Sequence, residues 1–203
     1  MGVLLLALSA AAGQTLLPEL RIEPVAGGSV FFIKNTAPQP LTAFVIELVD
    51  YPGSSYSLWR DEIASEPIAP GVEKRIAVAN MTVGAVPDYV KIQAAVYADG
   101  TSSGIPEKIA QLIDRRRLTL QTTRELMRRI EKAQSAGTPK AELTGELKQW
   151  SDSITQPGKS KGNSPARALI SDIAARLEAR SYAETLDVLR ASERALSASK
   201  PSL

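Results

Sequence analysis

The 203-residue chain contains no histidine and no cysteine, which restricts the chemistry that its side chains can do. Ser-His-Asp and Cys-His catalysis both need an imidazole base, so both are excluded. Zinc sites built on His or Cys are excluded too, as are the usual haem and iron–sulfur ligands. Carboxylate-pair hydrolysis, a Ser-Lys dyad and oxygen-ligated metals remain.

An aromatic and acidic cluster is the first candidate site. Trp59-Arg60-Asp61-Glu62 is expected in a long loop, together with Tyr51 and Tyr56. Such a cluster suits a sugar or a calcium ion, but a calcium loop needs several spaced carboxylates and a glycine at the turn. The alternative is that Trp59 covers the end of a sandwich while the charges lie in water.

A dense basic run is the second candidate. Asp114-Arg115-Arg116-Arg117 is followed by four further cations: Arg124, Arg128, Arg129 and Lys132. On a helix these charges spread around the axis, whereas nucleic-acid binding needs a basic face with aromatic residues nearby. We therefore expect no nucleic acid. Solvated ion pairs such as Glu125–Arg128 and Arg128–Glu131 are the main alternative to an electrostatic role against an acidic surface.

The remaining reactive residues have no catalytic context. Ser160-Lys161 lies in a Gly- and Lys-rich stretch, Asp99-Gly100 is typical of a turn, and no glycine-rich loop has phosphate-binding spacing. We assign no catalytic residue, no cofactor and no metal. The possible binding surface consists of Tyr51, Tyr56, Trp59, Arg115, Arg116 and Arg117.

Residues 1–14, MGVLLLALSAAAGQ, are expected to be a signal peptide. A short apolar run precedes small residues that fit an A-x-A-like cleavage site, giving a mature start near Gly13 or Gln14. No Lys or Arg precedes the apolar run, which is consistent with a start further upstream. The run is shorter than the ~20 residues of a membrane span, and no later segment is long and apolar enough to be one. The mature chain is therefore expected in the periplasm or outside the cell.

Residues 16–104 have strand periodicity and a net charge of −4. The strongest strand is Leu41–Val49, and another, Tyr89–Tyr97, is expected to place Val90, Ile92, Ala94 and Val96 on one face. Turns recur every 8–15 residues, which favours a small β-sandwich. Its strand count stays open because residues 54–66 and 80–88 are ambiguous.

Two short motifs add a resemblance. Phe32-Ile33-Lys34-Asn35-Thr36 followed by Pro38, Pro40 and Leu41 resembles the strand–turn–strand of bacterial immunoglobulin-like or fibronectin-like export domains. The run from Ala95 to Gly104 is similar to a late strand in uncharacterised secreted proteins of soil bacteria, Acidobacteria-like. The resemblance implies a sandwich and export, and it carries no catalytic residue.

Residues 105–203 have helical periodicity and a net charge of +6. A long helix is expected from Pro106 to a C-terminal cap at Gly137, with a stripe of apolar residues along one side. Arg116 and Thr123 interrupt this stripe at positions where a strict coiled coil would have apolar residues. The stripe consists of Ile109, Ile113, Leu120, Met127 and Ile130. A second helix follows Pro139 and a flexible basic loop covers residues 156–164. Helices then start at caps Ser164 and Ser181.

The last two helices resemble one hairpin of a tetratricopeptide-type array. A solenoid needs about three repeats, so a bundle of three to four helices is the better prediction. The expected fold is thus a segregated α+β chain, an immunoglobulin-like sandwich followed by a helical bundle. The expected function is a non-catalytic exported protein that binds another protein or an envelope component. The alternatives are a glycan-directed hydrolase using carboxylates and, without export, a cytoplasmic helical adaptor.

Overall fold

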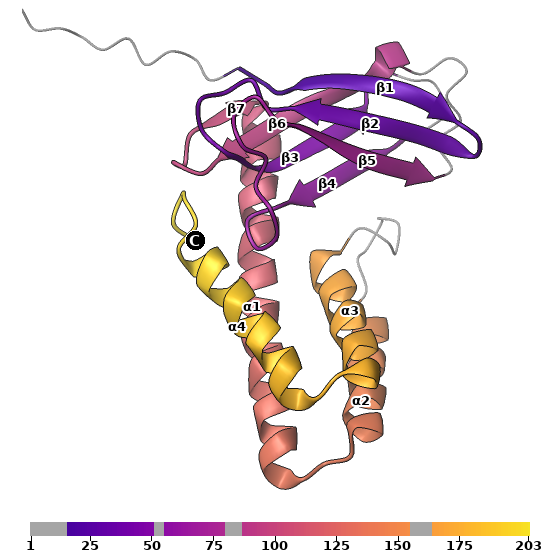
Figure 1. The fold of residues 1–203 in the computed structure, drawn as a ribbon, viewed down its shortest axis with the longest axis vertical. Coiled ribbons are helices and arrows are strands. Elements are labelled where there is room, and N and C mark those ends of the chain that lie inside the picture. Colours follow the sequence, from indigo (N-terminus) through magenta and orange to yellow (C-terminus); the bar gives the residue numbers. More distant parts are fainter. Residues whose placement is uncertain (1–15, 51–54, 80–86, 155–163) are drawn as a thin grey trace, which may run out of the picture.

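The structure, a computed structural model, describes residues 16–50, 55–79, 87–154 and 164–203. All its strands precede its α-helices: two antiparallel sheets form one end of the molecule, and the α-helices extend from them (Figure 1). The expected segregation of an all-β part from an all-α part is confirmed. No helix in these ranges has the length and apolar character needed to cross a membrane.

The smaller sheet has three strands in the order β1-β2-β5. Their bounds are β1 (Glu19–Val25), β2 (Gly28–Lys34) and β5 (Glu73–Ala79). β2 lies in the middle and directs Phe31 and Ile33 inward, where both are fully buried. Strands β1 and β5 alternate between more buried and more exposed residues over much of their length, as expected for a sheet with one face in water.

The larger sheet has four strands in the order β4-β3-β6-β7. Their bounds are β3 (Leu41–Leu48), β4 (Ser57–Asp61), β6 (Val90–Tyr97) and β7 (Ser102–Gly104), and the short 3-10 helix η1 (Pro87–Tyr89) precedes β6. The central strands β3 and β6 match the two strands predicted most clearly from sequence. The loop expected around Trp59 is wrong, because residues 57–61 pair with β3 as an edge strand.

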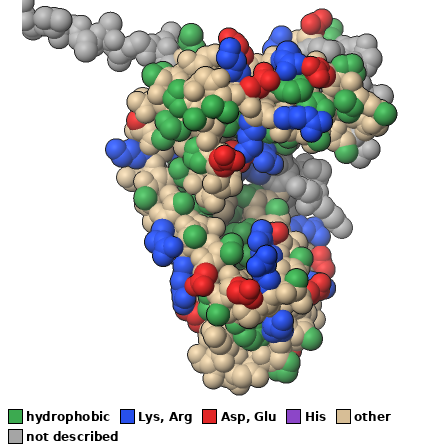
Figure 2. Space-filling view, in the orientation of Figure 1, with side chains coloured by type: hydrophobic (Ala, Val, Ile, Leu, Met, Phe, Trp, Pro, Cys, Tyr) green, Lys and Arg blue, Asp and Glu red, His purple; other side chains and the backbone are tan. Residues whose placement is uncertain are grey.

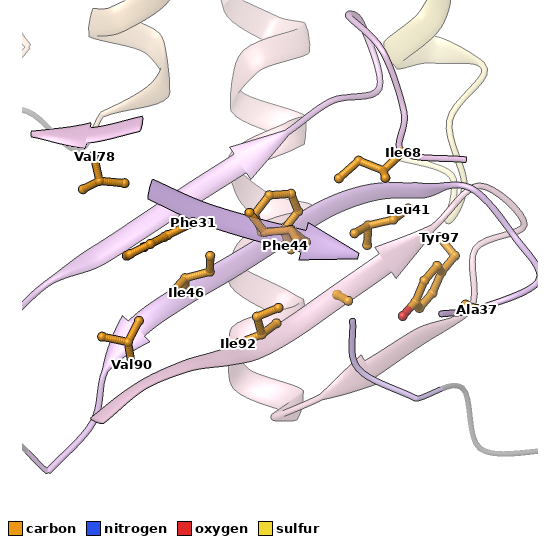
Figure 3. Packing of buried hydrophobic residues seen from close by; sticks show 12 residues of the cluster. Phe31, Ala37, Leu41, Phe44, Ile46, Ile68, Val78, Val90, Ile92 and Tyr97 are labelled. Carbon is orange, nitrogen blue, oxygen red and sulfur yellow. The ribbon is translucent and has the colours of Figure 1, made fainter. Parts of the chain in front are cut away.

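The main core fills the space between the two sheets. Figure 3 shows Phe31 of β2 beside Phe44 and Ile46 of β3, with Ile92 and Tyr97 of β6 on the same side. All of these side chains are at most 7% exposed. Complete burial of side chains of this size contributes about 1.5–3 kcal/mol each, so this layer is the main source of stability for the β part.

Two bulges change which residues face this core. Leu41 pairs with Tyr97 and Ala43 with Val96, so Thr42 is the extra residue on β3; Val45 and Ile46 pair with Ala94 and Ile92, so Gln93 is the extra residue on β6. A bulge shifts the period-two alternation by one position. The prediction that Val90, Ile92, Ala94 and Val96 share one face is therefore wrong, because Ala94 and Val96 point away from the inter-sheet core.

The outward side chains beyond the bulges form a second apolar layer under the first helix. Ala43, Val45, Ala94 and Val96 are buried there against Leu112, with Ile109 and Trp59 partly buried at its edge. Both faces of the central strands are therefore covered in this region, which explains the nearly unbroken apolar sequence of β3. The helix packs on the outer face of the sheet rather than on the end of the sandwich.

Four helices form the rest of the described chain. They are α1 (Pro106–Ala136), α2 (Lys140–Ser153), α3 (Pro165–Ala179) and α4 (Tyr182–Ser197). The predicted signals at their ends are confirmed: Pro106 starts α1, Gly137 ends it with φ 67°, Ser164 caps α3 and Ser181 forms a capping box with Glu184. Most of the loop expected over residues 156–164 lies outside the described residues.

The helices share a third core, in which α3 packs against α1, α2 and α4. The buried line of α1 differs from the predicted stripe, because it includes the two polar residues that seemed to interrupt it. Arg116 is 2% and Thr123 is 1% exposed, and both lie in line with the buried Leu112, Leu126 and Ile130. Of the predicted stripe, Leu120 and Ile130 are buried, whereas Ile109, Ile113 and Met127 are only partly buried.

Gly104 ends β7 and sets the direction in which α1 leaves the sheet. Its φ is +101°, and a Cβ atom there would lie 2.2 Å from the carbonyl oxygen of Gln93. That carbonyl also accepts a hydrogen bond from Ile105 N at 2.8 Å. The bulge on β6 and the start of the helix are thus held together at one glycine.

We expect Gly104→Ala to lower the free energy of unfolding by at least about 2 kcal/mol, through backbone strain and a clash with β6. Gly145→Ala is the matched control, because Gly145 lies inside α2 with open space around its Cβ position. There alanine should stabilise the protein by about 0.5–1 kcal/mol. Denaturant unfolding measures both changes, and a Gly104→Ala protein as stable as wild type would contradict the assigned role.

Candidate functional site

The β part and the helices are joined at the buried side chain of Arg116. Its Nε donates to Asp61 Oδ2 at 2.7 Å, and its Nη2 donates to Asp61 Oδ1 at 3.0 Å and to Thr42 Oγ1 at 3.1 Å. Its Nη1 lies 3.3 Å from the carbonyl oxygen of Lys200, which it can reach as a fourth acceptor. One guanidinium thus connects α1, β3, β4 and the C-terminal segment. We call this set the joint.

Local sequence places each acceptor of the joint. Asp61 is the last residue of β4, and Thr42 is the bulge residue of β3, where its hydroxyl also donates to Val96 O at 2.9 Å. The bidentate geometry with a carboxylate is the strong form of this interaction. Removing a cation from water is costly, and this cost is offset only by acceptors of good geometry, which here reach all three guanidinium nitrogens.

Beside the joint, cations of α1 lie against Trp59. The ring centroid is 5.0 Å from the Arg115 guanidinium carbon and 5.7 Å from Lys108 Nζ. Lys108 also pairs with Glu47 of β3 at 2.7 Å, and burial lowers the pKa of Arg115. Cation–π contacts of this kind contribute roughly 0.5–2 kcal/mol each, so this cluster helps to hold α1 on the sheet.

The neighbouring carboxylate, Glu62, is 2% exposed and binds a set of side chains separate from Arg116. Its two oxygens accept from Arg60 Nε at 2.9 Å, from Lys74 Nζ at 2.9 Å and from Ser65 Oγ at 2.8 Å. Burial pushes the pKa of Glu62 upward, but these hydrogen bonds and the charge of Arg60 outweigh it and lower the pKa overall. Asp61 and Glu62 therefore serve separate ion pairs and do not converge on one metal position.

The structure divides the binding surface expected from sequence. Trp59 and Arg115 come together, whereas Arg116 is buried and so is withdrawn from any open surface. Arg117 is exposed and pairs with Asp114, and Tyr56 packs edge-on against Phe31 with ring centroids 6.4 Å apart. Tyr51 lies outside the described residues.

The acidic residues of the described ranges form no group of three or more that could hold a metal ion. Asp99 has a turn role, because its Oδ1 accepts from the backbone N and the hydroxyl of Thr101 at 2.9 and 2.7 Å. Those hydrogen bonds lower the pKa of Asp99.

The basic run is largely engaged in ion pairs, and Figure 2 shows acidic and basic side chains interspersed over the helical end of the molecule. The predicted pair Glu125–Arg128 is confirmed at 2.7 Å, and Arg124 pairs with Glu193 of α4. The predicted pair Arg128–Glu131 is wrong, because Glu131 instead pairs with Arg190 of α4 at 3.1 Å. Glu131 thus pairs with a residue of the antiparallel helix α4, although its spacing along the sequence suggested a partner within α1.

A groove of about 440 Å³ lies between the end of α1 and the start of α2, and sequence reasoning did not find it. Its α1 wall carries Arg128, Arg129 and Lys132, its α2 wall carries Glu142 and Glu146, and between them lie the buried Ala133 and Leu143. The Arg129 guanidinium carbon is 4.3 Å from the Trp150 ring centroid, a contact that spans the two helices. We call this the charged groove.

A second hollow, of about 620 Å³, lies beside β7. Leu17, Thr36, Ser103 and Ile109 are among its lining residues, and its rim includes Leu16, where the described chain begins. The hydroxyl of Tyr97 donates to the carbonyl of Leu16 at 2.6 Å and fixes the chain at this point.

Comparison with known proteins gives no relative: no protein-family model, no curated protein and no solved structure matches the chain. The function is therefore argued from the geometry of this molecule.

The two partners of the joint differ in exposure, and this predicts unequal effects of removing them. Asp61→Ala leaves a guanidinium that is 2% exposed without its carboxylate, so we expect a loss of about 3–5 kcal/mol in unfolding free energy. Arg116→Met leaves Asp61, which is 27% exposed and can rehydrate, so we expect a smaller loss of about 1–3 kcal/mol.

Denaturant unfolding of both variants and of the double variant measures the difference and the coupling. Arg117→Met, at an exposed ion pair, is the control and should change stability by less than about 0.5 kcal/mol. If Arg116→Met proves the more harmful, or if both changes are as small as the control, the joint does not act as described.

Glu125 gives a pH prediction. Hydrogen bonds from Arg128 and Arg129 lower its pKa to about 2, well below the ordinary value. A depressed carboxyl pKa stabilises the folded state above the unfolded pKa, and this contribution disappears as the pH falls toward the folded one. We expect the stability advantage of wild type over Glu125→Gln to be complete above pH ~5 and to vanish near pH 2. An advantage that does not change with pH across this range would refute the assignment.

Proposed function

We propose that this chain is a non-catalytic exported protein that acts as a protein-binding or structural module of the cell envelope, in the periplasm or outside the cell. The observation that carries the proposal is the joint. It fixes a 31-residue helix to the sheet, and such a helix is about 45 Å long. Surfaces on the β part and on the helices are thereby held in a constant relation, which suits a binding module.

We further propose that the β part belongs to the immunoglobulin-like class. Constant-type immunoglobulin domains place strands 1, 2, 5 and 4 in one sheet and 3, 6 and 7 in the other. Here strands 1, 2 and 5 form one sheet, and strands 3, 6 and 7 form the other with strand 4 added beside strand 3. The arrangement differs only in the sheet to which the fourth strand belongs. The edges of such sheets are ordinary sites for protein binding.

Export is consistent with the point in the sequence at which the described β core begins. The core residues among those described begin at Leu17, and Leu16 is 71% exposed. Cleavage near Gly13 or Gln14 would therefore leave every described core residue in the mature chain. The apolar run of residues 3–8 followed by small residues supplies the processing signal.

One fractionation experiment tests location and binding together. The full chain with a C-terminal epitope is expressed in a bacterial host, recovered from the envelope fraction by affinity capture, and sequenced from its N-terminus. We expect a mature start at Gly13 or Gln14 and at least one envelope component retained above background. Leu5→Arg is the control for export, because a charge in the apolar run should leave the chain unprocessed in the cytoplasm.

A matched bait pair tests whether the fixed relation of the two parts matters. The Asp61→Ala/Arg116→Met variant should retain the partner less well than a Glu178→Gln control, which removes an exposed ion pair with Lys148 outside the expected binding surface, provided that both baits are folded by circular dichroism. Recovery of the wild-type chain in the cytoplasm with Met1 intact would contradict export. An exported chain that retains nothing above background would contradict binding.

A further inference from the structure

We propose that the charged groove binds a small zwitterion, an amino acid or a short peptide that carries a free ammonium and a free carboxylate. The inference rests on the proposed binding function and names the chemistry of one ligand. It is argued from the walls of the groove and from the charges that the folded chain leaves unmatched there.

The groove has the size and the fixed walls of a small-molecule site. Its volume of about 440 Å³ lies within the usual range of roughly 300–1,000 Å³. It exists because α1 packs on α3 and α4 while α2 packs on α3, so that the two helices diverge from the turn after Gly137. The contact of Arg129 with Trp150 holds the walls at a set separation.

The α2 wall provides two carboxylates that the structure leaves unpaired. Glu142 and Glu146 are both exposed and lie one turn apart, and neither has a described Lys or Arg nitrogen within 4 Å. Like charges at this spacing repel each other. Their field reaches Tyr182, whose pKa is raised first by burial and then by these two charges. An ammonium group placed between them would relieve the repulsion.

The α1 wall provides the opposite charge. Arg128 and Arg129 share one carboxylate, Glu125, so this trio keeps one net positive charge. Lys132 lines the groove and has no carboxylate of the described residues within 4 Å. A ligand carboxylate would therefore face Lys132 with Arg129 beside it.

The balance of the two walls selects a zwitterion over a simple ion. The α1 wall has two net positive charges and the α2 wall has two negative charges, yet no ion pair joins the walls among the described residues. A simple anion or cation would satisfy one wall and meet repulsion at the other. A molecule with both groups satisfies both walls and is held in one orientation, because charge complementarity sets specificity and register.

The test is an NMR titration of isotope-labelled mature chain with L-alanyl-L-alanine at low ionic strength, ~20 mM, where screening is weak. We expect saturable shifts that concentrate between residues 128 and 146. The N-acetylated dipeptide and the dipeptide amide, which each lack one charge, should bind at least 5-fold more weakly, as expected for a lost charge-assisted contact. No saturable shift, or equal binding of the blocked ligands, would overturn the proposal.

Variants assign the two ends of the ligand. Glu142→Gln/Glu146→Gln should weaken binding of the dipeptide by at least 5-fold but should not weaken binding of the N-acetylated form, because the repulsion of its carboxylate by these two charges is removed. Lys132→Gln should likewise weaken binding of the dipeptide but not of the amide form. Glu178→Gln, at an exposed pair with Lys148 outside the groove, is the control and should have no effect. All these side chains are exposed, so a thermal melt should show folded variants. Dipeptide binding that survives both groove variants refutes the site.

Failure of this proposal can be told apart from failure of the proposed function. If the chain is exported and retains an envelope partner but shows no dipeptide shifts, only the groove proposal is contradicted. If the chain binds the dipeptide but remains in the cytoplasm, the envelope assignment is contradicted and the groove proposal is supported.

Discussion

The burial of one positive charge is the constraint on which the rest of the structure depends. Arg116 is buried where α1 meets β3 and β4 of the larger sheet, and Leu112, one turn earlier in α1, belongs to the apolar layer there. A guanidinium is stable there only if acceptors surround it, because its desolvation is not repaid by packing. The end of β4, the bulge on β3 and the carbonyl of Lys200 must therefore all come to this point. Segments that are far apart in sequence are aligned by the hydrogen-bonding needs of a single side chain.

The bulges are the second condition for this arrangement. A regular β3 and β6 would direct alternate residues to the core along their whole length and would present polar side chains such as Gln93 to the helix. By inserting Thr42 and Gln93, the strands shift their alternation, so that Ala43 and Ala94 lie under α1. Small side chains there allow the helix to approach closely. The Thr42 hydroxyl then donates to Val96 and accepts from Arg116, which links strand pairing to helix docking.

The parts of the fold that sequence predicts are those governed by local chemistry. Pro106, Gly137, Ser164 and the Ser181–Glu184 box mark helix ends because their backbone preferences act within a few residues. The joint escapes such reasoning, since an arginine in a helical stripe looks like an interruption until its acceptor, 55 residues away, is known. The bulges escape it for the same reason: the phase of the alternation is set by the partner strand. The charged groove was missed because its walls belong to two helices, although Glu142 and Glu146 at one-turn spacing were a visible signal.

Charged side chains are arranged differently where the β part meets the helices and at the charged groove. The β part is net negative and the helical part net positive, and ion pairs such as Glu47–Lys108 and Asp61–Arg116 join them where they meet. Along α1, further cations pair with α4 or with the preceding turn. At the groove, by contrast, opposite charges face each other without meeting, although nearby side chains of the same types form pairs readily. Exposed pairs contribute little to stability, so the fold loses little by leaving these charges apart. A ligand that bridges them gains contacts that the chain alone does not make, which is why the groove suits binding better than it suits folding.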